Sequence, residues 1–409
     1  MHILFLTDNF PPEVNAPASR THEHCREWVK AGHQVTVITT APNFPTGRVF
    51  AGFRNRLYAR EELDGIQVVR VWTYITANEG FLKRSLDYIS FAVAAVLAGL
   101  FTRRFDVVVG TSPQFFTACA AWFLGFLRRR PFVFELRDLW PESIRAVGVM
   151  KSGRVLDLLE KVELFLYRRA SAVVSVTHAF KADLIRRGIG ASKIHVVTNG
   201  ADLTHFRPRP RDAVLEAQLG LAGKFVIGYV GTHGMAHALG TVLDAAKMVQ
   251  NQAKGDRLRF VLLGDGAQKS ALKARAADMG LGSVIFIDTV PKAEVARYWS
   301  LLDVSIVHLK REPLFATVIP SKLFECMAMG IPVLHGVAGE SAEIVLRDQV
   351  GEVFTPEDAG ELAVASQRLV DDPSALATMS ANGVKAARAY DRTVLAGRML
   401  EILASVARR

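Results

Sequence analysis

Short apolar runs alternate with longer segments of helical periodicity along the chain. The runs are rich in Val, Ile and Phe without alternating polar positions, which is typical of strands buried on both faces of a parallel sheet. The pattern predicts strands at 2–7, 34–40, 66–72, 107–111, 132–136, 172–176, 194–198, 225–231, 259–264, 284–288, 304–309 and 332–335. It predicts helices near 19–31, 82–101, 114–128, 153–170, 179–187, 239–253, 267–279, 292–301, 321–329, 357–371, 374–389 and 392–407.

The alternation stops once, near the middle of the chain, and then restarts. A turn at 199–202 and the run RPRPR at 207–211 separate the two series. We therefore expect an α/β fold of two doubly wound, Rossmann-like domains, with a C-terminal helix that crosses back to the first. The expected parts are 1–205, 206–389 and 390–409. Ligands bind outside the carboxyl ends of strands in such sheets, so an interdomain cleft is expected.

Composition narrows the class of protein. The three cysteines, Cys25, Cys119 and Cys326, lie far apart among 409 residues and form no CxxC motif. A disulfide framework and a structural zinc site are therefore both disfavoured, and we expect a cytoplasmic protein. Asp8 interrupts the opening apolar run too early for a secretory signal.

The net charge of +10 is concentrated in the first half of the chain. Residues 1–205 hold 26 Lys and Arg against 18 Asp and Glu, whereas residues 206–409 hold 24 against 22. This excess suggests an anionic partner, either phosphates or a membrane surface, and the alternative is a basic, solvated surface. Nucleic acid is disfavoured because no recognition-helix motif or aromatic-interleaved basic strand is present.

One predicted helix is apolar on all sides. Residues 81–104 hold this helix, with Lys83 and Arg84 at one end and Arg103 and Arg104 at the other. Such a helix is either packed into the core or in peripheral contact with the inner face of the cytoplasmic membrane. The second alternative would use the positive charge of this half on anionic headgroups.

The loops exclude several familiar sites. The turn at 7–13 has no glycine, so it is not a GxGxxG dinucleotide loop. Walker A and a GxSxG triad are absent as well. No Asp-x-Asp pair occurs, which argues against a metal-bridged nucleotide-sugar site.

The most informative segment is IPSKLFECMAMGIP at 319–332. Ser321 is a candidate N-cap, and a helix start with Lys322 is suited to an anion. Glu325 follows about 5 Å along the helix axis, where its carboxylate can accept two hydroxyl hydrogen bonds. A diphosphate and a ribose diol have about this separation, and the alternative is a surface Lys–Glu pair.

Two glycine-rich turns support a nucleotide site. Gly231 and Thr232 follow one predicted strand, and Gly264 and Gly266 follow the next. Backbone N–H groups in such turns can face a phosphate or a base.

These residues resemble a known family. The chain is similar over nearly its full length to GT-B glycosyltransferases of family 4, and within them to the bacterial O-antigen and capsule subgroup that includes N-acetyl-L-fucosamine transferases. The segments that carry the resemblance are PPEVNAPASR, GHQVTVITTAPNFPTG, RDLWPES, TNGAD, LLGDG and PSKLFECMAMGIPVL.

The resemblance implies a UDP-sugar donor on the C-terminal domain, an acceptor on the N-terminal domain, retention of configuration and no metal. It implies that Glu325 holds the ribose, that Lys322 faces the diphosphate and that Val290 contacts the base. Gly231 and Thr232 would line the phosphates. The chain departs from the family where Thr317 replaces the first of two glutamates. Thr232 and either His237 or Ala238 replace an arginine and a lysine.

In the N-terminal half the expected site residues lie in two loops. Arg137 and Asp138 stand where the family often has a His-Asp pair, and an arginine is not a general base. It is a candidate phosphate ligand. Candidates to orient the acceptor hydroxyl are Asp138, Glu142 and Glu13. Asn15 and Ala16 would lie near the donor diphosphate, at a helix start.

The function expected from these features is transfer of a hexosamine or 6-deoxyhexose from a UDP-sugar to an acceptor saccharide on a polyprenyl diphosphate. The alternative is a nucleotide-sugar 2-epimerase of the same two-domain architecture, which the 11–20 and 137–143 segments disfavour.

Overall fold

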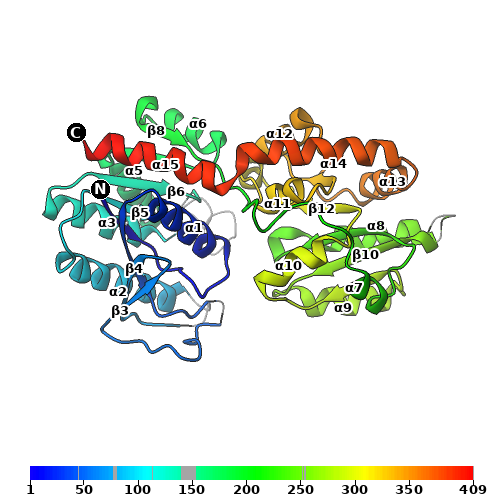
Figure 1. Cartoon of the computed structure of the whole chain (residues 1–409), viewed down its shortest axis with the longest axis horizontal. Coiled ribbons are helices and arrows are strands. Elements are labelled where there is room, and N and C mark those ends of the chain that lie inside the picture. The colour runs from blue at the N-terminus through cyan, green and yellow to red at the C-terminus, as the bar shows by residue number, and fades with distance from the viewer. Residues whose placement is uncertain are drawn as a thin grey trace. The chain divides into compact units, whose positions relative to one another are not determined.

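The computed structural model describes residues 1–44, 46–76, 81–112, 114–139, 153–250, 252 and 255–408. Contacts divide the chain into two compact units (Figure 1). Unit 1 comprises Met1–Asn199 and Arg392–Arg409, and unit 2 comprises Gly200–Asp391. The division lies between 199 and 200, where the sequence predicts one between 205 and 206.

Unit 1 is built on an eight-stranded sheet in the order β3-β4-β2-β1-β5-β6-β7-β8. All neighbouring strands are parallel except β3 and β4. The strands are β1 His2–Leu6, β2 Gln34–Thr40, β3 Tyr58–Leu63, β4 Ile66–Val71, β5 Val107–Thr111, β6 Phe132–Leu136, β7 Ala172–Ser175 and β8 Ile194–Val196.

Helices cover both faces of this sheet. α2, α3 and α5 pack together on one face, and α1 and α15 lie side by side on the other (Figure 1). The helices are α1 Ala16–Lys30, α2 Phe81–Leu100, α3 Phe115–Arg128, α5 Arg154–Arg169, α6 His178–Arg186, η1 Ala191–Lys193 and α15 Arg392–Ala407.

The last helix of the chain completes the core of the first unit. The Trp28 indole on α1 donates to the Ala396 carbonyl on α15 at 2.9 Å. Arg392 pairs with Glu23 where α15 begins. Leu395 and Met399 are buried in the same core as the strands of unit 1. A helix over 392–407 therefore belongs to unit 1 although unit 2 precedes it.

Unit 2 has a six-stranded parallel sheet in the order β11-β10-β9-β12-β13-β14. The strands are β9 Phe225–Val230, β10 Leu258–Leu263, β11 Val284–Ile287, β12 Val304–His308, β13 Val333–Gly336 and β14 Gly351–Val353. The helices are α7 Ala213–Gln218, η2 Met235–His237, α8 Gly240–Gln250, η3 Gly255–Arg257, α9 Lys269–Asp278, α10 Lys292–Trp299, η4 Pro313–Thr317, α11 Lys322–Met329, α12 Glu340–Asp348, α13 Ala359–Val370, α14 Pro373–Ala387 and η5 Arg388–Tyr390.

Apart from the short η helices, four elements were not expected from the sequence: β3, α7, α12 and β14. β3 reads YAREEL and is mostly exposed, since it is an antiparallel edge strand. An edge strand lacks the continuous apolar run of a central parallel strand. β14 has three residues and α7 buries only Leu215, so their hydrophobic patterns are weak. α12 has nine residues and buries Ile344 and Val345, so its amphipathic pattern was present in the sequence and was missed.

Candidate functional site

The loops after β9 and β10 meet at the carboxyl edge of the unit 2 sheet. Gly231 and Gly264 have φ of +144° and +140°, values that side chains rarely adopt. A Cβ atom on Gly264 would lie 1.9 Å from the Gly231 carbonyl oxygen. The two glycines therefore allow one loop to pack directly against the backbone of the other.

The backbone N–H groups of these glycines form hydrogen bonds within the protein, whereas the sequence predicts that they face a phosphate or a base. Those of Gly231 and Gly264 donate to Leu263 and Ile287 carbonyls at 2.9 and 3.0 Å, and that of Gly266 donates to the Asp265 carboxylate at 2.7 Å. They continue the hydrogen bonding of the sheet and its loop, so they are not presented to a ligand. The glycines act here through close packing.

Lys322 opens α11 and points at this glycine loop. Its Nζ lies 3.7 Å from the centroid of the Tyr229 ring, a cation–π contact. A Cβ atom on Gly231 would lie 2.7 Å from Nζ, so a side chain at this position would displace the ammonium group. Among the described residues, Nζ has no hydrogen-bond partner.

The electrostatics mark Lys322 as a cation without a complete counter-charge. Burial lowers its pKa to about 7, although Cys326 and Glu325 oppose the shift. Burial also lowers the pKa of His233 to about 4 and of His237 to about 3. The neighbouring histidines are therefore neutral at pH 7, and an anion would supply the charge-assisted hydrogen bonds that Nζ lacks.

The rest of the predicted α11 site is arranged around this lysine. Glu325 is half-buried in the first turn of α11. Ser321 occupies the N-cap position, but its side chain makes no capping bond, because its backbone is already helical at φ −58° and ψ −28°. The Thr317 hydroxyl donates to the Leu314 carbonyl at 2.6 Å and is used within η4.

Thr232 and Val290 occupy the neighbouring loops. Thr232 is exposed, and its carbonyl accepts from the Tyr229 hydroxyl at 2.8 Å. Val290 is half-buried and packs against the core of unit 2. Tyr229, which orders both Lys322 and Thr232, was missed from the sequence because it looks like an ordinary strand residue.

In unit 1, Glu13, Asn15 and Ala16 lie where the chain enters α1. Asn15 caps the helix by accepting from the Ala18 N–H at 2.8 Å, and Ala16 is its first residue. The helix therefore begins three residues before the predicted start. The Glu13 carboxylate is 3% exposed, and its Oε1 accepts from the Asn43 and Phe44 N–H groups.

The expected phosphate ligand Arg137 has a different role. Its guanidinium donates to Glu135 at 2.9 Å, to the Pro17 carbonyl at 3.1 Å and to the Thr21 hydroxyl at 2.8 Å. All three nitrogens are thus used inside unit 1. Glu135 is fully buried, so it needs cationic partners to keep its charge. Burial opposes that charge, but Arg137 and Arg20 outweigh burial and lower the pKa of Glu135 to about 2.

The two remaining candidates are less informative. Asp138 is half-buried, and its N–H contacts the Ser112 hydroxyl at 3.2 Å. Glu142 lies outside the described residues. The parts of the chain that the structure describes contain no group of three or more His, Cys, Asp or Glu side chains fit to hold a metal ion. Metal independence stays a prediction.

A pocket at the carboxyl edge of the unit 1 sheet contains residues that were missed. It has a volume of about 220 Å³ and is lined by Asp8, Glu13, Asn15, Asp87 and Tyr88, among others. Asp8 directly follows β1, and Asp87 is an acid in an otherwise apolar helix, signals that single out both positions. Their proximity across about eighty residues is a tertiary feature.

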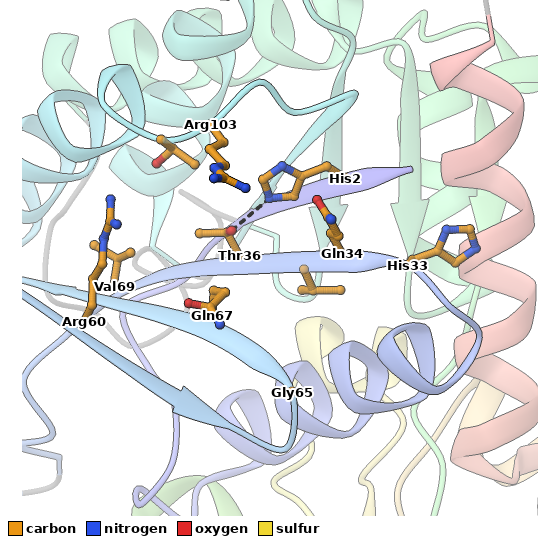
Figure 2. Close-up of a pocket in the computed structure, with 11 residues that line it drawn as sticks. His2, His33, Gln34, Thr36, Arg60, Gly65, Gln67, Val69 and Arg103 are labelled. Atoms are coloured by element: carbon orange, nitrogen blue, oxygen red, sulfur yellow. Dashed lines mark hydrogen bonds between the residues drawn. The ribbon is translucent and has the colours of Figure 1, made fainter.

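The opposite edge of the same sheet carries a larger hollow of about 460 Å³ (Figure 2). His2, Thr36, Arg60 and Arg103 line it, and His2 Nε2 bonds the Thr36 hydroxyl at 2.8 Å. It lies at the amino ends of β1 and β2, where α/β sheets do not bind their ligands. Volume alone therefore does not identify the functional site.

α2 is not buried on all sides. Phe91 and Ala95 face the core, but the other face carries exposed apolar side chains. These are Leu86, Ile89, Val93 and Leu97, followed by Phe101, with exposed fractions of 42–80%. Within the described ranges, no helix has both the length and the apolarity needed to cross a bilayer.

Two sheets of this kind, each with alternating helices, define the GT-B fold of glycosyltransferases. The structure superposes on sucrose-phosphate synthase from Thermosynechococcus elongatus with a TM-score of 0.76 and 18% sequence identity. The match covers 99% of this chain and 98% of the synthase. It also superposes on Anabaena HepE, solved with UDP-glucose, with a TM-score of 0.74 and 21% sequence identity. This match covers 99% of this chain and 100% of HepE. These likenesses establish the fold.

Sequence comparison establishes the family. Residues 15–200 match the glycosyl transferase 4-like domain, and residues 224–372 match glycosyl transferases group 1. The chain belongs to these glycosyltransferases and is an enzyme of that class. Nothing in the matches supports a 2-epimerase.

The chain is also similar to named glycosyltransferases of bacteria. One is WcaI of Escherichia coli, described as a colanic acid biosynthesis glycosyl transferase, with 28% identity over 81% of this chain and 82% of its own. Another is WbjE of Pseudomonas aeruginosa, described as a glycosyltransferase, with 27% identity over 69% of each chain.

Proposed function

We propose that this glycosyltransferase takes a hexosamine or a 6-deoxyhexose, with N-acetyl-L-fucosamine as one candidate, from a UDP-sugar. The acceptor is a saccharide carried on a polyprenyl diphosphate, and the product belongs to a surface polysaccharide such as O-antigen or capsule. The observation that carries the donor assignment is the buried ammonium group of Lys322, which lacks a hydrogen-bond partner among the described residues.

In this proposal the donor lies along the start of α11. Lys322 contacts the diphosphate, and Glu325 accepts the two ribose hydroxyls one turn further along. Val290 contacts the base. The acceptor oxygen bonds to the anomeric carbon with retention as the bond to the diphosphate breaks, and the hydroxyl proton is released. Lys322 stabilises the charge that develops on the leaving UDP.

The donor assignment is tested by incubation with UDP-, GDP- and dTDP-sugars and measurement of nucleotide release. Glu325→Ala is expected to abolish most turnover and to weaken UDP binding. Glu343→Ala is the matched control, since Glu343 is an exposed acid in the first turn of α12. Full activity and full UDP affinity in Glu325→Ala would contradict the assignment.

We also propose that α2 binds the inner face of the cytoplasmic membrane. Exposed apolar side chains, including Val93 and Leu97, lie along one face of α2. Basic residues lie in the first turn of α2 at Lys83 and Arg84 and just after it at Arg103 and Arg104. This combination suits an anionic bilayer, because apolar side chains enter the acyl boundary while cations meet the headgroups.

Sedimentation with vesicles containing phosphatidylglycerol tests this contact. Leu97→Glu is expected to lower the bound fraction severalfold, whereas Val364→Glu, at an exposed position on α13 of unit 2, leaves it unchanged. Equal binding by both variants would refute a role for α2.

A further inference from the structure

The hollow at the amino edge of the unit 1 sheet is lined by basic and neutral side chains (Figure 2). Arg60 comes from β3 and Arg103 from the segment just after α2, so cations reach the hollow from two separate elements. Among the described residues that line it, none is an aspartate or a glutamate. The substrates of α/β enzymes bind at the other edge of the sheet. A ligand in this hollow is therefore neither the sugar donor nor the acceptor.

Both guanidinium groups keep hydrogen-bond donors for a ligand. The Arg103 side chain has no hydrogen bond or ion pair to any described residue. The Arg60 Nε donates to the Tyr58 hydroxyl, and the guanidinium carbon lies 5.3 Å from the centroid of the Tyr58 ring. The two terminal nitrogens of Arg60 have no partner in the part of the chain that the structure describes. The fork of N–H groups on an arginine matches the oxygens of a phosphate.

The acids near the hollow bond to donors of the protein itself. Glu62 Oε2 accepts from the Gln67 amide at 2.8 Å, and Asp106 Oδ2 accepts from the His2 N–H at 2.7 Å. Asp64 pairs with a histidine of α1 at 2.9 Å. None of these three acids lines the hollow. The lining therefore has two cations and no anion among the described residues, a balance that favours an anionic ligand.

The other polar walls are neutral. His2 Nδ1 donates to the Arg104 carbonyl at 3.0 Å, so Nε2 is the acceptor and receives the Thr36 hydroxyl at 2.8 Å. The exposed Gln34 amide has no partner among the described residues and is a further donor. The volume of about 460 Å³ lies within the roughly 300–1,000 Å³ of small-molecule sites. The hollow therefore has room for an organic phosphate, not only for an inorganic ion.

An exposed apolar surface adjoins the hollow. Arg103 follows two residues after Phe101, whose side chain is 80% exposed just beyond the end of α2. Leu97, one turn earlier, is 55% exposed. A glycerophospholipid likewise carries its phosphate next to hydrocarbon, so cations beside apolar side chains match this class of ligand. A free phosphate would have no use for the apolar surface.

We infer that this hollow binds the phosphodiester headgroup of an anionic glycerophospholipid, with Arg60 and Arg103 as the phosphate ligands and the Gln34 amide as a further donor. The inference rests on the membrane contact proposed for α2 and deepens it, because it assigns a site for one lipid headgroup at the end of that helix. Contact with the bilayer then depends on the chemistry of the headgroup and not on surface charge alone.

The test uses the full chain and phosphorus NMR of glycerophosphoglycerol, the headgroup of phosphatidylglycerol without its acyl chains. The wild type is expected to broaden the phosphorus line, and Arg103→Gln and Arg60→Gln are expected to lose this effect. Arg104→Gln is the matched control, since Arg104 is exposed and carries the same charge but does not line the hollow. On phosphatidylglycerol vesicles, Arg103→Gln is expected to bind at least fivefold more weakly than Arg104→Gln.

Equal behaviour of Arg103→Gln and Arg104→Gln overturns the inference, because the effect would then be general attraction to negative charge. No broadening by the wild type also overturns it. Broadening of inorganic phosphate without broadening of glycerophosphoglycerol would assign the hollow to a free phosphate instead. Leu97→Glu separates the two proposals. Unchanged vesicle binding in Leu97→Glu would defeat the α2 contact, whereas headgroup broadening and its loss in Arg103→Gln decide on the hollow alone.

Discussion

The carboxyl edges of the two sheets hold ionisable groups of opposite kind. In unit 2 the central group is Lys322, an ammonium with an aromatic ring and a glycine loop around it. In unit 1 it is a trio of carboxyl groups, Asp8, Glu13 and Asp87. Both contain a buried polar atom without a partner among the described residues, Nζ in one and Oε2 in the other. The same sheet architecture thus prepares one edge for an anion and the other for hydrogen-bond donors.

Lys269 and Lys322 of unit 2 both have a buried ammonium group, but they differ in their partners. Lys269 donates to the Gly264 and Ile287 carbonyls and pairs with Asp288. Lys322 has no such partner among the described residues. The first is therefore a structural lysine that holds the β10 loop. The second has only the Tyr229 ring and nearby charges to offset its desolvation, so a bound anion would stabilise it further.

The largest expected effect is the loss of donor binding in Lys322→Met. A charge-assisted hydrogen bond contributes about 1.5–3 kcal/mol, so UDP affinity measured by calorimetry is expected to fall roughly 10- to 150-fold. The unfolding temperature is expected to stay level or rise, because a buried unpaired cation is removed. Lys269→Met, as the counterpart, is expected to lower it. An equal fall in unfolding temperature in Lys322→Met and Lys269→Met would show that Lys322 is structural too.

A pH titration of donor affinity is expected to give a smaller change. Lys322 has a pKa of about 7 in the unliganded protein, so it is protonated below this value and loses its charge above it. The diphosphate of UDP-glucose, a diester, keeps its charge in this range. If only the protonated lysine binds it, affinity falls roughly tenfold from pH 6 to pH 8. Lys322→Met is expected to lack this dependence, and a similar slope in it would assign the titration elsewhere.

A further effect is expected on the stability of unit 1 rather than on ligand binding. The pKa of Asp8 rises from 3.8 unfolded to about 8 folded, so the folded state binds the proton more tightly. Its contribution is complete below pH 4 and is lost as the pH rises toward 8. The unfolding temperature of the wild type is expected to fall over this pH range, and Asp8→Asn is expected to make that fall smaller. The corresponding change in unfolding free energy is at most a few kcal/mol. Glu62→Gln, the exposed control, should follow the wild-type slope.

The sequence predicts much of this architecture because its central strands are continuous apolar runs. Those at 34–40, 107–111 and 132–136 have the observed bounds. It does not predict β3, whose polar residues lie at a sheet edge. The difference follows from burial: only strands covered on both faces must be apolar throughout.

The site is predicted less completely than the fold. Lys322 and Glu325 follow from local helix geometry, since both lie within the first turn of α11. The role of Arg137 does not, because its partner Glu135 is set by strand burial and its other partners lie on α1. The meeting of Asp8 with Asp87 depends on how α2 packs on the sheet, which no local pattern encodes.

Because α15 follows all of unit 2 in the chain, a complete unit 1 is available only after unit 2 has been synthesised. Until then, the Trp28 indole lacks the Ala396 carbonyl and the core beneath α1 lacks Leu395 and Met399. Unit 2 is contiguous between residues 200 and 391, so it can finish first although it comes second. The usual order, in which the N-terminal domain folds before the next emerges, can therefore be reversed in this chain.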